Sequence, residues 1–275
     1  MRRALIIGPG GLRGAYSGGV VATLCRAFGH GYFDRIYGCS AGAYTGSYAV
    51  SGQPDQIESI WRECVHSDLL VDWSRVFTRK RPILDLFYLN DVLRSESYRL
   101  SIKDMLASPT TFEIVTTDRE TGQSHYFTPR SEEAFFLQVR ASAAVPVFHP
   151  KVSISGRTYV DGGLSDPIPL EKALADGCEE VTIVCNRPVV DIGRLANIFL
   201  HVYAGFTAQG SVRQVVKHLR RVSMLAETMA DRVHIIAPST THSHRWQFDS
   251  GHTILNQLVD LGIQDATTFI TGYKP

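Results

Sequence analysis

Short apolar segments that break into glycine-rich turns alternate along the chain with segments of helical spacing. Residues 4–7 are a continuous apolar run, residues 181–185 are apolar except for Thr182, and a shorter run at residues 36–37 leads directly into a glycine. Continuous apolar runs of this length are typical of strands that are buried on both faces of a parallel sheet. After the first run, apolar residues between positions 15 and 28 approximate helical spacing. The pattern predicts an α/β protein with a mostly parallel sheet.

Alternating apolar and polar positions in the middle of the chain predict two hairpins, over residues 111–127 and 152–160. Ser131 is expected to cap a helix, and a last strand is expected at residues 233–237. Further helices are expected at residues 54–65, from 90 onward, and at 169–175, 195–206, 212–226 and 251–270. In the helix at 212–226, the polar side is predicted to carry Arg213, Lys217, His218, Arg220 and Arg221.

The composition is that of an ordinary globular protein. The 275 residues are 44% hydrophobic and 20% charged, and their formal net charge is +1. Proteins that bind nucleic acid usually carry a strongly basic face, so we expect no nucleic-acid partner. Five cysteines without C-x-x-C spacing indicate neither a disulfide framework nor a zinc site. Since no apolar run is long enough for a signal-peptide core or a membrane span, we expect a cytoplasmic protein.

One dense basic run, Arg-Lys-Arg-Pro at residues 79–82, lies within an aromatic stretch between Trp73 and Leu89. Such a run is most simply a solvated loop. Beside aromatic side chains, the alternative is contact with the anionic head groups of a membrane surface.

A G-x-S-x-G motif at residues 38–42 follows the apolar run at 36–37. A strand-to-helix corner of this kind holds its serine in a strained turn above the amides of the next helix. Gly38 and Gly42 flank the corner, where the strand and the helix pass too close for side chains. Ser40 is therefore the candidate nucleophile.

The glycine-rich loop at residues 8–14 follows the first predicted strand, and two interpretations of it compete. A dinucleotide site requires G-x-G-x-x-G, but Arg13 occupies the third glycine position. The alternative is an oxyanion hole, in which Gly10 and Gly11 let bare amides approach a developing negative charge. If the first two strands are neighbours in a parallel sheet, this loop lies next to Ser40.

Asp161 follows the second predicted hairpin and precedes two glycines. A carboxylate in that position is held by rigid structure, while the glycines let a ligand or backbone approach, so it is the natural partner for Ser40. The alternative is an ordinary turn. A serine hydrolase usually takes histidine as its base, and the order of residues leaves a triad open with a downstream histidine: His201, His218, His234, His242, His244 or His252.

Four blocks occur in the order seen in patatin-like phospholipases, and the chain most resembles the bacterial members of that family. The blocks cover residues 10–14, 38–42, 141–146 and 161–163, and the resemblance extends over residues 4–188. It implies a three-layer α/β/α fold with the serine corner at the carboxyl edge of a mostly parallel sheet. Residues 1–190 would form the catalytic domain, and residues 191–275 a helical and strand extension packed on the same domain.

The resemblance also implies a function, namely hydrolysis of lipid or phospholipid acyl esters by a Ser40–Asp161 dyad without histidine. Gly10 and Gly11 would hold the oxyanion, and Arg13 would help to fix their loop. No metal or cofactor is expected, transient contact with a membrane surface is an option, and the oligomeric state stays open. One departure from the family is Pro9, which has no N–H to offer where the family often has a third glycine.

Two alternatives of other classes stay open. One is a non-catalytic protein that binds lipid and retains the pocket. The other is a histidine-assisted esterase for small soluble esters, in which replacement of one histidine would abolish turnover.

Overall fold

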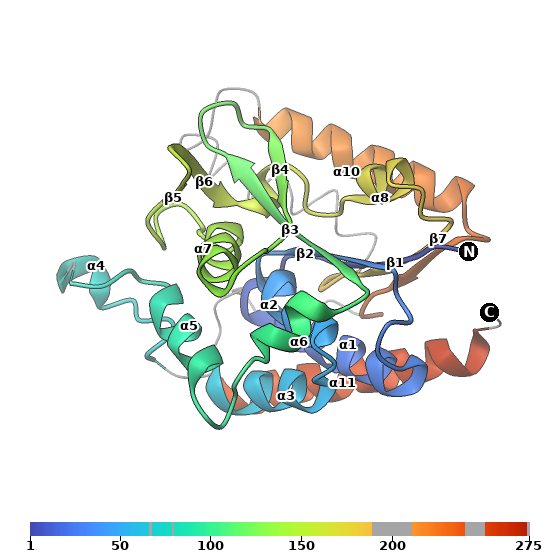
Figure 1. Cartoon of the computed structure of the whole chain (residues 1–275), viewed down its shortest axis with the longest axis horizontal. Coiled ribbons are helices and arrows are strands. Elements are labelled where there is room, and N and C mark those ends of the chain that lie inside the picture. The colour runs from blue at the N-terminus through green and yellow to red at the C-terminus, as the bar shows by residue number, and fades with distance from the viewer. Residues whose placement is uncertain (66–67, 79, 189–210, 240–250, 274–275) are drawn as a thin grey trace.

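A mixed sheet lies between two layers of helices in the computed structural model (Figure 1). The structure describes residues 1–65, 68–78, 80–188, 211–239 and 251–273. Within these residues the sheet has eight strands: β1 (Arg3–Ile7), β2 (Arg35–Cys39), β3 (Thr111–Asp118), β4 (Ser124–Phe127), β5 (Val152–Ile154), β6 (Arg157–Asp161), β7 (Glu180–Val184) and β8 (Val233–Ile236).

Five of these strands form a parallel unit in the order β3-β2-β1-β7-β8. The central strand β1 is buried over residues 4–7, as its continuous apolar run predicts. It pairs with β2 on one side, where Ala4 is opposite Arg35, and with β7 on the other, where Ala4 is opposite Val181. The predicted fold class is confirmed. Both predicted hairpins form, and they supply the antiparallel strands at the other end of the sheet.

The long strand β3 places the ends of two other strands side by side. It pairs with β4 through residues 114–117, with β2 through 111–115 and with β6 through 116–118. Because β4 overlaps both of the others, β2 and β6 must share the opposite edge of β3. Along that edge Val115 is opposite Cys39 and Thr116 is opposite Asp161. The carboxyl ends of β2 and β6 therefore meet.

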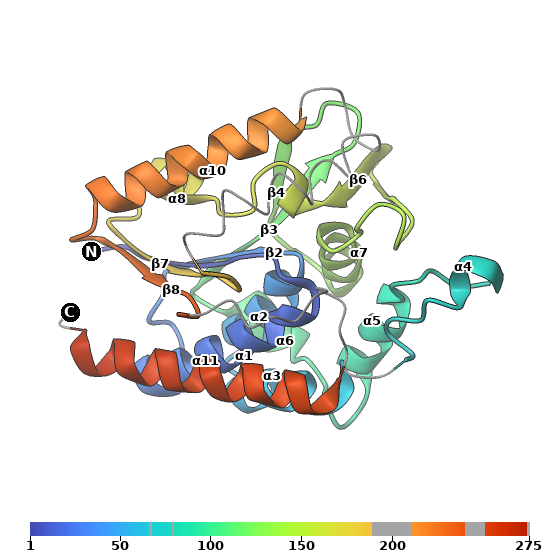
Figure 2. The ribbon, with the colours of Figure 1, turned by 180° about the vertical axis from the view of Figure 1, so that it is seen from behind.

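Helices cover both faces of the sheet (Figures 1 and 2). One face is covered by α8 (Leu170–Ala175) and α10 (Ser211–Thr228). The other is covered by α1 (Gly14–Phe28), α2 (Ala41–Val50), α3 (Pro54–Ser59), η2 (Ile60–Cys64), α6 (Ile102–Ala107) and α11 (His252–Gly272). At the hairpin end lie α5 (Leu86–Arg94) and α7 (Glu132–Ser142), with α4 (Arg75–Thr78) projecting beyond them. None of the described helices combines the length and apolar content needed to cross a bilayer.

The last helix, α11, packs against α1 with almost no side chain between the two backbones. A Cβ atom added at Gly19 would lie 2.1 Å from the carbonyl oxygen of Val259, and one added at Gly262 would lie 2.2 Å from that of Tyr16. The Tyr16 hydroxyl also donates a hydrogen bond of 2.8 Å to Asp265. A glycine from each helix thus permits the contact, which joins the end of the chain to its beginning.

Two helices differ from the sequence prediction in detail. The helix expected from residue 90 already begins at Leu86, because the Asp85 carboxylate accepts hydrogen bonds of 3.1 Å from the amides of Phe87 and Tyr88. The helix expected at 54–65 is regular only to Ser59 and continues as the wider turn η2. The helix predicted at 195–206 and the domain boundary predicted at residue 190 lie outside the described residues.

His218 is the clear correction in α10, because it is buried and does not lie on the polar side of the helix. Its Nε2 atom lies 2.7 Å from Oδ1 of Asp166. Lys217, Arg220 and Arg221 are exposed as predicted, whereas the side chain of Arg213 lies outside the described part of the chain. The helical pattern could not reveal a polar partner that belongs to a distant segment.

Candidate active site

Ser40 lies at the sharp corner between β2 and α2. Its backbone angles are φ 55° and ψ −122°, a conformation that side-chain-bearing residues rarely adopt. A Cβ atom added at Gly42 would lie 2.2 Å from the carbonyl oxygen of Ile7, and one at Gly38 would lie 2.6 Å from Cα of Ala43. The close approach expected at both glycines is therefore present, and it holds the serine in its strained turn.

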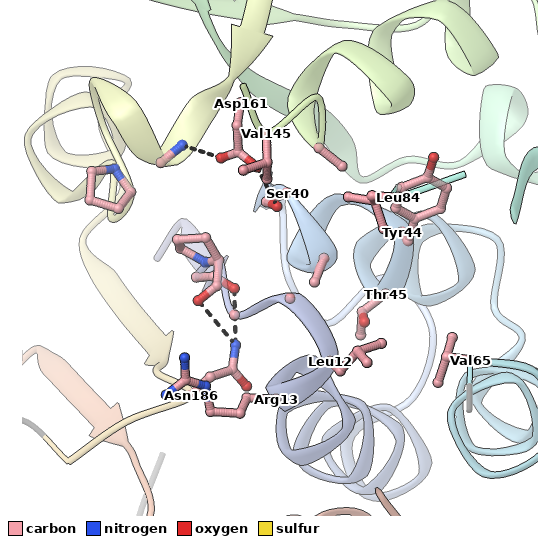
Figure 3. Close-up of a pocket in the computed structure, with 18 of the residues that line it drawn as sticks. Leu12, Arg13, Ser40, Tyr44, Thr45, Val65, Leu84, Val145, Asp161 and Asn186 are labelled. Atoms are coloured by element: carbon pink, nitrogen blue, oxygen red, sulfur yellow. Dashed lines mark hydrogen bonds between the residues drawn. The ribbon is translucent and has the colours of Figure 1, made fainter. Parts of the chain in front are cut away.

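The Ser40 hydroxyl donates a hydrogen bond of 2.7 Å to Oδ2 of Asp161 (Figure 3). Asp161 is the last residue of β6 and caps the short helix η3 (Gly162–Leu164), where its Oδ1 accepts a hydrogen bond of 2.8 Å from the amide of Gly163. Each carboxylate oxygen of Asp161 therefore accepts a hydrogen bond, and Oδ2 accepts its bond from the Ser40 hydroxyl. Both side chains are buried.

Ser142, the last residue of α7, connects Ser40 to the sheet. Its hydroxyl accepts a hydrogen bond of 2.8 Å from the amide of Ser40 and donates one of 2.6 Å to the carbonyl oxygen of Val115. Two residues later, the carbonyl oxygen of Ala144 accepts a hydrogen bond of 3.1 Å from the amide of Asp161. The small-residue segment at 141–146 therefore fixes both partners, and the sequence analysis did not foresee the role of the Ser142 hydroxyl.

Burial raises the pKa of Asp161 to about 6, although the hydrogen bonds from Ser40 and Gly163 act in the opposite direction. The ionised form of a carboxyl group is less stable in a dry site than in water, so its affinity for a proton rises. A carboxylate with this pKa is a better proton acceptor than a free aspartate and is still mostly ionised at neutral pH.

The glycine-rich loop between β1 and α1 is held by Asn186, which the sequence analysis missed. The Asn186 amide group donates hydrogen bonds of 3.2 Å and 3.4 Å to the carbonyl oxygens of Gly8 and Pro9 (Figure 3). Its Oδ1 accepts a hydrogen bond of 3.1 Å from the amide of Ser17. A Cβ atom added at Gly10 would lie 2.7 Å from Nδ2 of Asn186. A polar residue just beyond a buried parallel strand, at the ligand-binding edge of the sheet, was the available signal.

Arg13 ends the short helix η1 (Gly11–Arg13), and its amide donates a hydrogen bond of 3.2 Å to the carbonyl oxygen of Gly10. Burial, together with the charge of Arg187, lowers the pKa of Arg13 to about 10. The guanidinium group therefore stays charged at neutral pH. Gly11 has φ 57°, a conformation that costs glycine little.

All five predicted site residues line a cavity of about 210 Å³. Ser40 and Asp161 form one part of its wall, and Gly10, Gly11 and Arg13 form another. Arg187 adds a second guanidinium group. Apolar side chains from α2, α5 and the segment 60–65 supply much of the remaining wall, namely Tyr44, Ile60, Trp61, Val65, Leu86 and Leu89.

Three of the alternative histidine bases lie within the described residues, and each contacts a side chain outside the Ser40–Asp161 pair. His218 contacts Asp166, His234 contacts Glu180, and His252 contacts Asn256. His201, His242 and His244 lie outside the described residues. Over the described ranges, no three His, Cys, Asp or Glu side chains gather in a way that could hold a metal ion.

The sequence model of the Patatin-like phospholipase family matches residues 5–174. The chain is 28% identical over 190 residues to the uncharacterized protein YjjU of Escherichia coli (strain K12), a match that covers 68% of this chain and 52% of that protein. It is 29% identical over 179 residues to an uncharacterized NTE family protein of Mycobacterium tuberculosis, covering 62% of this chain and 44% of the relative. The chain thus spans about half the length of these curated relatives.

Among solved structures, VipD from Legionella pneumophila aligns with a TM-score of 0.49 and 15% identity, over 94% of this chain and 67% of that one. The match to the family model is the more informative of these comparisons. It covers more than half of the chain, including the glycine-rich loop, the serine corner and Asp161. The chain therefore belongs to the patatin-like phospholipase family.

Proposed function

We propose that this protein hydrolyses carboxylic esters of phospholipids or lysophospholipids, with Ser40 as nucleophile and Asp161 as base. The observation that supports this most directly is the hydrogen bond of 2.7 Å between the Ser40 hydroxyl and the buried Asp161 carboxylate, on the wall of a largely apolar cavity. Membership of the family supports lipid ester hydrolysis at a coarser level.

In the first half of the reaction, Ser40 Oγ attacks the carbonyl carbon of the ester while its proton passes to Asp161. The negative charge that develops on the carbonyl oxygen would be stabilised by the backbone amides of Gly10 and Gly11. Collapse of the tetrahedral intermediate breaks the ester C–O bond. The departing alcohol takes the proton from Asp161 and leaves an acyl-serine.

In the second half, a water molecule attacks the acyl-serine and gives a proton to the same carboxylate. The second tetrahedral intermediate collapses to release the fatty acid, and the proton returns to Ser40. Asp161 therefore acts alternately as base and acid, which its pKa of about 6 favours at neutral pH.

The lining of the cavity supports a lipid substrate. Its apolar side chains suit an acyl chain, since burial of each CH₂ group contributes about 0.8 kcal/mol. Arg13 and Arg187 bring positive charge to the same cavity, which favours a phosphate-bearing substrate over a neutral ester.

The test is release of fatty acids from a mixture of phospholipids by purified protein, followed by mass spectrometry. Ser40→Ala and Asp161→Asn should each lower the rate by about three orders of magnitude while the fold is retained. Asp118→Asn is the matched control, because Asp118 is also a buried carboxylate at a strand end but bonds to the turn amides of Glu120 and Thr121.

A fluorophosphonate probe should label the parent protein at Ser40 and leave Ser40→Ala unlabelled. Full activity in Asp161→Asn would remove the dyad. Lipid binding without labelling would favour the non-catalytic alternative, and loss of turnover after replacement of one histidine would favour a histidine-assisted esterase.

A further inference from the structure

A projecting arm, described over residues 72–78 and 80–83, leaves the body of the protein between η2 and α5 (Figures 1 and 2). A narrow neck closes its base. The amide of Asp72 donates a hydrogen bond of 3.0 Å to the carbonyl oxygen of Ile83, and the amide of Asp85 donates one of 2.8 Å to that of Leu70. Helix α4 lies within the arm and projects away from the sheet.

The arm displays large apolar side chains to solvent. Phe77 is 89% exposed, Trp73 is 50% exposed and Val76 is 47% exposed. Single exposed apolar residues are ordinary on protein surfaces. Three of them within five positions on a projecting element form an apolar patch, which is typical of a site that binds a protein or a membrane. Tryptophan and phenylalanine are also side chains that favour the boundary between water and lipid.

A neighbouring loop extends this apolar surface. The ring of Phe148 packs edge-on against Trp73, with 5.5 Å between the ring centroids, and the Phe148 carbonyl oxygen accepts a hydrogen bond of 2.9 Å from the amide of Leu84. The preceding residue, Val147, is 60% exposed and has φ 74°. A β-branched residue in the left-handed region is strained, so the loop presents Val147 to solvent at a cost.

The arm also concentrates positive charge. Residues 72–82 include four basic residues and one acidic residue, whereas the whole chain has a formal net charge of +1. Arg75 is largely buried and bridges Asp72 and Asp85 at the neck. Lys80 and Arg81 are exposed, and Arg81 also pairs with Asp85. Basic and aromatic side chains together match a surface that offers both anionic head groups and apolar chains.

The base of the arm belongs to the wall of the cavity that contains Ser40. Leu70, two residues before the arm, and Leu84, immediately after it, both line that cavity. A lipid surface bound by the arm would therefore lie next to the candidate active site. An enzyme that takes its substrate from such a surface requires this arrangement.

We propose that the arm docks this protein on bilayers that contain anionic phospholipid. In this arrangement Trp73, Val76 and Phe77 enter the boundary between head groups and acyl chains, while Lys80 and Arg81 contact phosphate groups. This docking does not depend on the proposed hydrolysis, because it is measured with the Ser40→Ala variant, which also leaves the vesicles intact.

The first experiment is sedimentation of the full-length Ser40→Ala protein with vesicles of phosphatidylcholine, alone or mixed with phosphatidylglycerol. We expect binding to the mixed vesicles, reduced about tenfold by the further change Phe77→Ser. Leu106→Ser is the matched control, because Leu106 is an exposed apolar residue on α6 and its replacement should leave binding unchanged. Equal binding by both variants, or no binding by the parent, would overturn the proposal.

The second experiment reverses one charge. Lys80→Glu should weaken binding to the mixed vesicles about fivefold or more, since a basic residue near an anionic surface contributes about 1 kcal/mol, which converts to about fivefold. Lys103→Glu, which changes an exposed lysine on α6, should have no comparable effect. Equal losses in the two variants would mean that only overall charge matters and would contradict docking through the arm.

The third experiment measures depth with Trp73 as the reporter. Vesicles made with brominated phospholipid should quench part of the tryptophan fluorescence in the Ser40→Ala protein, and the change Trp73→Phe should remove that quenching. Binding that is lost in Lys80→Glu but gives no quenching would indicate adsorption without insertion. Binding of the parent to RNA in place of vesicles would assign the arm to another class of partner. Either result would overturn the proposal.

Discussion

The two glycine-rich corners of the sheet follow neighbouring parallel strands but are built on opposite plans. The corner after β2 presents a side chain, that of Ser40, and its glycines let backbone press against backbone. The corner after β1 places Gly10 and Gly11 in the cavity wall and is held by the side chain of Asn186, which bonds to Gly8 and Pro9. The corner that holds the Ser40 side chain is fixed by steric contact, whereas the corner that we propose to offer bare amides is supported by a polar side chain.

The atoms that crowd each corner show the difference most clearly. At Gly42 the nearest atom to an added Cβ is the backbone oxygen of Ile7 in the central strand, at 2.2 Å. At Gly10 the nearest atom is at the end of the Asn186 side chain, at 2.7 Å. A side chain can move aside and a central strand cannot. A substitution in the serine corner should therefore mainly lower the stability of the fold. A substitution that disturbs the glycine loop should mainly lower the activity.

The largest expected effect is that of Gly42→Ala on stability. The added methyl group would overlap Ile7, and we expect the free energy of unfolding to fall by about 3 kcal/mol or more. Urea denaturation followed by circular dichroism measures it. Gly272→Ala, at a glycine with open space around it, is the control and should stay within about 0.5 kcal/mol of the parent. A Gly42→Ala protein of parental stability would contradict the steric account.

The next effect should appear in activity. Asn186→Ala removes the support of the glycine loop. We expect kcat to fall by roughly ten- to a hundredfold, because in the proposed mechanism the loop stabilises an oxyanion that forms only in the transition state. Asn186→Asp keeps an acceptor for the amide of Ser17 but loses the donors to Gly8 and Pro9. A similar loss of kcat in both variants, with KM little changed, would assign the effect to the loop. Unchanged kcat in Asn186→Ala would show that the loop needs no such support.

The third effect depends on pH and concerns the partner of the serine corner. In the proposed mechanism Asp161 must be ionised to accept a proton, so the rate should fall as pH decreases through about 6. The raised pKa also means that folding disfavours the ionised carboxyl group. Asp161 therefore lowers the stability as pH rises above the pKa that its carboxyl has in the unfolded chain and through about 6. Asp161→Asn should therefore melt at a higher temperature than the parent above pH 6, with the difference shrinking in acid.

The smallest expected effect concerns the Asp166–His218 pair, which lies in a segment next to the glycine loop. Pro167 lines the same cavity as Gly8, and its neighbour Asp166 pairs with His218. Burial alone would lower the pKa of His218, but the hydrogen bond and charge of Asp166 outweigh it and raise the pKa. The stability from this pair is therefore complete below the ordinary histidine pKa and is lost as pH rises through the higher folded value.

At pH 6, His218→Gln should lower the melting temperature by about 2–4 °C relative to the parent, and by less at pH 9. Thermal unfolding at the two pH values measures this difference. An equal decrease at both pH values would mean that packing, and not the charge on His218, stabilises this segment.

Local patterns were sufficient to predict the features that lie within one stretch of chain. The parallel strands, both hairpins, the Ser131 cap and the close approach at Gly38 and Gly42 all follow from neighbouring residues. The contacts that were missed join distant segments. Asn186 reaches a backbone amide 169 positions away, and Ser142 reaches one 102 positions away. A single sequence carries no local signal of such partners, because only the sheet order brings them together.

The close approach of α1 and α11, at Gly19 against Val259 and at Gly262 against Tyr16, has a practical consequence for anyone who shortens the gene. The recognisable family block ends at residue 174, yet the helix that starts at the glycine loop is clasped by the 21 residues of α11. A fragment cut to the family block would expose the face of α1 that packs against α11, and it would also lose β7, a neighbour of the central strand. An expressed fragment should therefore extend beyond the family match and include α11.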